Sequence, residues 1–156
     1  MGNGTTKYLN TNRANNADPQ DDKHLSVYQS SLSTLISVLI GSDNVPGRSA
    51  LISFPSTGIS ARINAQPTTS NNGNGIGFVG GSRSTSSTSV KRVNATNILD
   101  SMPSQNPSSL EIGVFATGSG GTVANNRIAF YSIGESLDLA LLDARVTTLI
   151  NAYGAI

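Results

Sequence analysis

The residues best placed to cleave a glycosidic bond are two glutamates, because glycosidases use a pair of carboxylates about 5 to 10 Å apart as acid and base or nucleophile. Glu111 and Glu135 are the only glutamates in the chain. Glu111 falls on the solvent-facing positions of a predicted strand, away from any second acid in the sequence. The pattern therefore predicts no catalytic residue and leaves glycosidase activity as a minor alternative.

Two other groupings could support chemistry at a site. His24 is the only histidine, and no Gly-x-Ser-x-Gly turn accompanies the many serines, so we interpret it as a surface residue at the start of a strand rather than as a hydrolase base. Asp18, Asp21 and Asp22 could ligate calcium together with carbonyl oxygens. Their spacing fits no calcium-loop motif, so we interpret them as solvated charges, leave calcium binding open, and predict neither a metal site nor a cofactor.

Sugar recognition needs amide groups that hydrogen-bond hydroxyls and an aromatic ring that packs against the sugar. The polar stretch 66–75 supplies Asn71, Asn72 and Asn74, and we predict these as carbohydrate-binding residues. Tyr8 and Tyr28 are the candidate aromatic platforms. The alternative is that these polar residues are simply solvated.

Composition excludes several classes of protein. Charged residues make up 12% of the chain and the formal net charge is +1, so there is no concentrated basic surface for nucleic acid. The chain has no cysteine, so neither disulfides nor thiolate metal sites stabilise it. The N-terminal residues lack the apolar stretch of a secretory signal, and no apolar run is long enough to span a bilayer. We predict no export by that route and no membrane insertion.

Most of the chain shows the two-residue alternation of β-strands. The predicted strands are 24–28, 35–40, 48–54, 59–65, 76–80, 89–93, 109–116 and 127–133. Residues 1–23 are predicted to be an extended segment in which only Tyr8-Leu9 could anchor a strand. The first two strands are expected to be antiparallel neighbours, and 127–133, which is apolar on both faces, is expected to be central. In 59–65 the odd-numbered residues are expected to face the core, and Ser60, Arg62 and Asn64 the solvent.

The C-terminal segment 135–153 predicts an amphipathic helix instead. Its apolar residues recur at three- and four-residue spacing: Leu139, Leu142, Val146, Leu149 and Tyr153. Ser132 with Glu135, or Ser136 alone, could cap its start, and Gly154 suits its end. This apolar stripe either packs on the sheets or forms an interface with a second copy or another protein.

Many short strands at about ten-residue spacing, without alternating helices, predict one all-β domain over residues 1–156. The predicted architecture is a two-sheet antiparallel sandwich with one C-terminal α-helix.

Three blocks of sequence resemble a known family. They are GNGTTKYLN at 2–10, which continues from Asn12 through Gln20 to His24, GFVGGSRS at 77–84, and RIAFYSIGESL at 127–137, which continues through Asp138 to Leu149. Together they resemble concanavalin A-like, laminin-G-type domains of tailed-phage structural proteins. The likeness spans nearly the whole chain and is most specific in the last block.

The resemblance implies a concanavalin A-like jelly roll whose role is recognition of a glycan or of a partner protein. It implies a non-enzymatic phage virion protein, located in the virion, that binds cell-surface carbohydrate or another virion protein and associates with itself or assembles in a particle. The alternative is a purely structural capsid, tail or fibre subunit, or a decoration protein, that binds no glycan. The relatives carry strand material ahead of the first block, so we expect either that a sheet edge is left open here, as a site for assembly with another chain, or that something else pairs with it.

Overall fold

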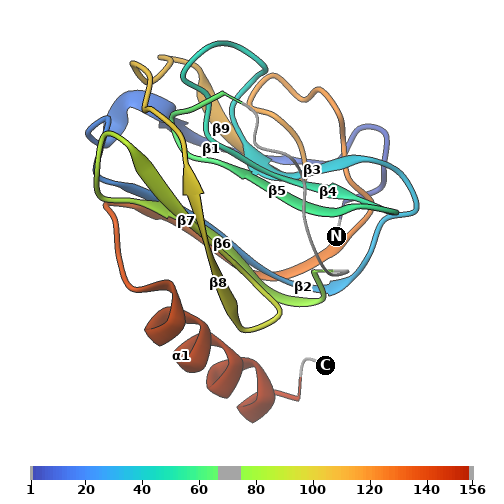
Figure 1. The fold of residues 1–156 in the computed structure, drawn as a ribbon. Helices are drawn as coiled ribbons and strands as arrows, with labels where there is room; N and C mark the ends of the chain where they lie inside the picture. Colours follow the sequence, from blue (N-terminus) through green and yellow to red (C-terminus); the bar gives the residue numbers. More distant parts are fainter. Residues whose placement is uncertain (1, 67–74, 155–156) are drawn as a thin grey trace.

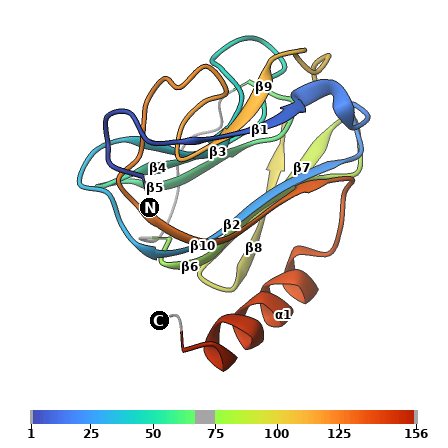
Figure 2. The ribbon, with the colours of Figure 1, turned by 180° about the vertical axis from the view of Figure 1, so that it is seen from behind.

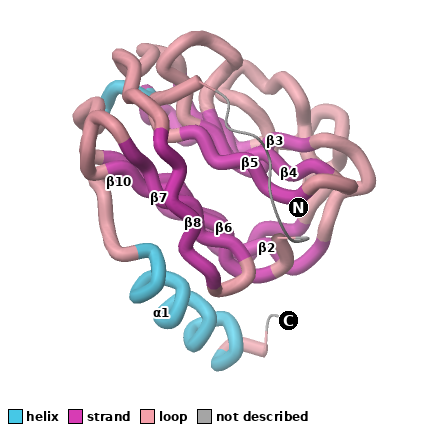
Figure 3. Tube along the Cα trace, in the orientation of Figure 1, coloured by secondary structure: helices cyan, strands magenta, loops and turns pink. Residues whose placement is uncertain are grey.

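The computed structural model describes residues 2–66 and 75–154, which form two antiparallel β-sheets packed face to face and one C-terminal helix (Figure 1). The first sheet has the strand order β1-β9-β3-β4-β5 and the second β10-β2-β6-β7-β8. The same two layers, with the helix outside the second sheet, are seen from behind in Figure 2 and by element type in Figure 3. This arrangement confirms the predicted two-sheet sandwich with one terminal helix.

The elements have the following bounds. The first sheet contains β1 (Leu9–Ala14), β9 (Glu111–Val114), β3 (Ser37–Gly41), β4 (Ala50–Phe54) and β5 (Gly58–Arg62). The second contains β10 (Arg127–Gly134), β2 (Lys23–Ser31), β6 (Gly77–Arg83), β7 (Thr88–Val93) and β8 (Thr96–Ser101). A short 3-10 helix, η1 (Asn15–Ala17), follows β1, and α1 (Leu139–Ala152) follows β10.

The core lies between the sheets, where aliphatic side chains from both layers meet. Its fully buried members include Leu25, Leu39, Ile59 and Ile112. The alternation predicted in 59–65 is half right: Ile59, Ala61, Ile63 and Ala65 are buried, but so are Ser60 and Asn64, which were expected to face solvent.

Two predicted strand relationships are wrong. The strands at 24–28 and 35–40 are not neighbours, because β2 and β3 belong to different sheets. The strand at 127–133 is not central, because β10 forms one edge of its sheet and only β2 pairs with it. In the segment 1–23, β1 pairs with β9 across a register irregularity, so the strand there extends beyond the Tyr8-Leu9 anchor that the sequence indicated.

Helix α1 packs on the outer face of the second sheet. Leu139, Val146 and Ile150 are buried against Tyr28 and Phe78. Asp138, and neither Ser132 nor Ser136, caps the helix: its carboxylate accepts hydrogen bonds from the backbone N–H groups of the two residues after Leu139. The predicted stripe therefore lies partly on the sandwich. Within the described residues, no helix is both long and apolar enough to cross a bilayer.

Candidate binding site

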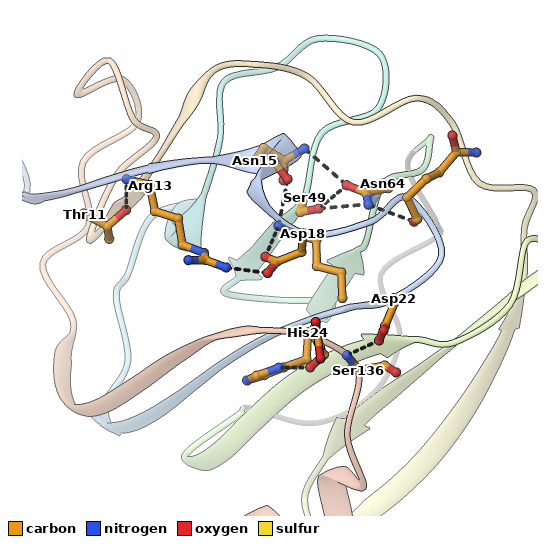
Figure 4. A network of polar contacts seen from close by, with 12 residues as sticks. Thr11, Arg13, Asn15, Asp18, Asp22, His24, Ser49, Asn64 and Ser136 are labelled. Carbon is orange, nitrogen blue, oxygen red and sulfur yellow. Dashed lines mark hydrogen bonds and ion pairs between the residues drawn. The ribbon is translucent and has the colours of Figure 1, made fainter.

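A network of buried polar side chains closes one end of the sandwich (Figure 4). Lys23, at the start of β2, has no exposed surface, and its Nζ donates to the backbone carbonyl of Asn15 at 2.8 Å and to Oδ2 of Asp18 at 3.0 Å. The other carboxylate oxygen of Asp18 pairs with Arg13. Burial raises the pKa of Asp18, but hydrogen bonds and charge attraction from Arg13 and Lys23 together hold it below its usual value. The buried ammonium group is therefore paired.

Asn64 connects this network to the strands of the first sheet. Its backbone has φ +49°, in the left-handed region that asparagine tolerates better than most residues. Its Oδ1 accepts from Ser49 Oγ at 2.8 Å and from Asn15 Nδ2 at 3.2 Å, and its Nδ2 donates to the carbonyl of Gln20 at 2.9 Å. Asn64 is fully buried, so these bonds fix the start of β4 against the end of β5. Arg48 lies just before β4, and Arg62 is the last residue of β5.

Arg48 and Arg62 line a surface hollow of about 320 Å³ beside this network. The hollow also includes Asn44, Val45 and Gln66. Nη1 of Arg48 donates to Asn44 Oδ1 at 2.7 Å, and Nη1 of Arg62 reaches the same oxygen at 3.4 Å. One neutral amide oxygen thus accepts from two guanidinium groups.

The hollow carries positive charge with little to balance it. Within residues 2–66 and 75–154, no carboxylate forms an ion pair with Arg48 or Arg62. Burial, and secondarily the charge of Arg62, lowers the pKa of Arg48 to about 10, and Asp43 opposes this shift. Burial also lowers the pKa of Arg62. The structure thus places two neighbouring guanidinium groups, with Arg48 still protonated at neutral pH, around a space that could receive hydrogen-bond acceptors.

Of the predicted sugar-binding residues, the structure describes Tyr8 and Tyr28, and these two do not lie at one site. Asn71, Asn72 and Asn74 lie outside the described residues. Tyr8 is 41% exposed and lines a smaller hollow of about 200 Å³ with Lys7, Leu9 and Phe115. Tyr28 is 6% exposed and lies beneath α1, so it has no ring face to offer a sugar; the prediction of Tyr28 as a platform is wrong.

The candidate catalytic and metal-binding residues are also separated. Glu111 begins β9 and Glu135 directly follows β10, on different sheets, and both are exposed. Asp18 is buried and paired rather than solvated, and Asp22 Oδ1 instead accepts from the backbone N–H of Ser136 at 2.7 Å. In the described part of the chain, no group of three histidine, aspartate or glutamate side chains is arranged to hold a metal ion.

His24 is buried rather than at the surface, which corrects its interpretation as a surface residue. Its Nδ1 lies 2.6 Å from the carbonyl of Glu135 and its Nε2 lies 2.9 Å from Ser132 Oγ. Burial lowers the pKa of His24, with the Glu135 carbonyl opposing the shift. The carbonyl can only accept, so Nδ1 carries the proton and Nε2 accepts from Ser132. These bonds hold β10 to β2.

The predicted interface residues divide between two sides of α1. Leu139 and Val146 are buried on the sheet, and Leu142 packs partly against them. Leu149 and Tyr153 are 47% and 79% exposed. Only these last two are available on the surface of the isolated chain.

The arginine-lined hollow was not predicted from the sequence, whose low charge indicated no concentrated basic surface. One signal could have found it: between Asp43 and Asp100 the chain has no acidic residue, although it contains Arg48, Arg62 and three further basic residues. Such a stretch cannot pair its own charges locally. Which of those charges come together still depends on how the strands associate.

Comparison with models of known protein families gives no match for this chain. Comparison with curated proteins likewise finds no match.

Proposed function

We propose that the protein is a non-enzymatic, lectin-like phage virion protein that binds carbohydrate on a cell surface. The observation that carries the proposal is the hollow at Arg48 and Arg62, which is lined by two guanidinium groups and by the side-chain amides of Asn44 and Gln66. Guanidinium forks and amides are the groups that proteins use to hydrogen-bond sugar oxygens. The resemblance of the three sequence blocks to concanavalin A-like virion domains supports the same proposal.

A glycan array tests the carbohydrate proposal directly. The purified protein should bind at least one class of surface glycan, and Arg62→Gln should weaken that binding. A second variant, in which Asn71, Asn72 and Asn74 are all replaced by alanine, tests the predicted loop separately. No binding by the native protein to any glycan would contradict the function.

A second candidate function is purely structural, as a capsid, tail or fibre subunit or a decoration protein. It is favoured by exposed apolar side chains on the outer side of α1: Leu141, Leu149 and Tyr153. The strands β1, β5, β8 and β10 also end the two sheets and could accept another chain. Light scattering tests this function, because a protein that remains a monomer at high micromolar concentration does not assemble through these surfaces alone.

A further inference from the structure

We propose that the hollow at Arg48 and Arg62 is an oxyanion site that takes a carboxylate, sulfate or phosphate group, so that the carbohydrate it recognises is an acidic one. The acidic sugar rests on the function proposed above. The oxyanion site rests only on the geometry of the hollow.

The first argument is that guanidinium donors at this site lack acceptors. Within the described residues, Arg48 Nε and Nη2 and Arg62 Nε are buried and have no hydrogen-bond partner. Arg48 as a whole is only 5% exposed. Buried donors on charged groups are nearly always satisfied in native proteins, by protein, water or ligand. A bound oxyanion would supply the acceptors that residues 2–66 and 75–154 do not.

The second argument concerns Asn44, whose side-chain oxygen lies where an anionic oxygen would bind. It accepts from both arginines, at 2.7 and 3.4 Å. Asn44 belongs to an exposed turn, so its amide can move aside without disturbing the core. An oxyanion in its place would make the same two contacts with a full negative charge, and such charge-assisted bonds are about twice as strong as neutral ones.

The third argument is that the nearest acid does not neutralise the site. Asp43 forms no ion pair with Arg48 or Arg62 among the described residues, although its charge raises the pKa of Arg48. Its Oδ1 accepts a hydrogen bond from Ser119 Oγ at 2.6 Å, on a different loop. Among the described residues, Asp43 therefore offsets the positive charge of the two arginines only in part, and attraction for an external anion remains.

The fourth argument is the size and rigidity of the hollow. Its volume of about 320 Å³ is at the lower end of the range of roughly 300 to 1,000 Å³ for small-molecule sites. That volume suits one charged sugar residue rather than a long oligosaccharide. The backbone beside Arg48 is held by the bonds between Ser49 and Asn64, so little ordering is needed on binding.

Calorimetric titration of the full chain tests the proposal with inorganic sulfate, glucuronic acid and glucose as probes. Native protein should bind sulfate and glucuronic acid but not glucose. Arg62→Gln should weaken binding of both anions at least tenfold. Arg62 is the residue to change because it is more exposed than Arg48. Arg145→Gln, which removes an exposed arginine of α1, is the matched control and should leave binding unchanged.

Asn44→Asp provides an independent readout that does not depend on removing an arginine. Its carboxylate should occupy the position of the anion, so the variant should melt at a higher temperature than the native protein and lose sulfate binding. Unchanged anion binding in Arg62→Gln, or native sulfate affinity in Asn44→Asp, would overturn the inference.

The two proposals fail in different ways. Sulfate binding that depends on Arg62, without binding of any glycan, would keep the oxyanion site and reject the carbohydrate function. Binding of a glycan by a native protein that does not bind sulfate would keep the carbohydrate function and reject the oxyanion site.

Discussion

Replacing Asp18 by alanine should be among the most destabilising changes in this protein. It would leave the ammonium of Lys23, whose side chain is fully buried, without its carboxylate partner. Removing one member of a buried ion pair typically lowers the free energy of unfolding by about 3–5 kcal/mol. With an unfolding entropy of about 2.1 cal/mol/K for each of the 156 residues, the melting temperature should fall by about 9–15 °C.

Thermal and denaturant unfolding of three variants would measure this effect. Arg13→Gln is the control for the same carboxylate: the Arg13 side chain is 40% exposed, so its loss should lower stability by less than about 1 kcal/mol. Adding Lys23→Met to Asp18→Ala should restore most of the lost stability, because the unpaired charge is then gone. A loss in Asp18→Ala no larger than in Arg13→Gln would refute the reasoning.

Three further predictions concern other buried or capping groups. Burial lowers the pKa of His24, so His24 stays neutral in the fold, whereas the unfolded chain takes up a proton near pH 6.5. The free energy of unfolding should therefore fall as the pH drops below about 6.5, by at most about 1.4 kcal/mol per pH unit. In denaturant titrations, His24→Gln should flatten this dependence. Asp138→Ala should lower stability by about 1 kcal/mol and speed amide exchange in the first turn of α1, whereas Ser136→Ala should not. Replacing Lys91 by methionine together with Asp100→Asn should raise the free energy of unfolding by about 1–3 kcal/mol, because the charge of Lys91 acts on the carboxylate of Asp100 while Lys91 Nζ and Asp100 Oδ2 are both buried without hydrogen-bond partners in the described residues; a destabilised double variant would contradict this.

The fold class could be predicted from sequence because eight of the ten strands alternate or form compact apolar runs. The two missed strands, β1 and β8, are polar and owe their conformation to their partners. Strand β8 forms a hairpin with β7 through Asn94 and Ala95, which have φ +49° and +58°. Such two-residue turns are usually marked by glycine, and alanine at the second position gives no such signal.

The candidate site was less predictable because its residues depend on contacts made far along the chain. Asn64 appeared to be a solvent-facing residue of an alternating strand, yet η1 and the backbone of Gln105 cover it. His24 and Asp18 likewise looked solvated in the sequence. In the fold, β10 packs against His24, and the segment after β1 folds so that Asp18 within it is buried. Charge pairing between such segments has no local sequence pattern to reveal it.

The pairing of strands has a consequence for how the chain acquires its structure during synthesis. Strand β1 pairs only with β9, about a hundred residues later, and β10 pairs with β2 across a similar separation. Chains dominated by such distant pairings fold in roughly milliseconds to seconds, more slowly than helical bundles. Neither sheet can be completed until residues 111–134 have left the ribosome. Until then the strand edges that pair with β9 and β10 remain unpaired in the nascent chain. Chaperone binding would matter most in that interval.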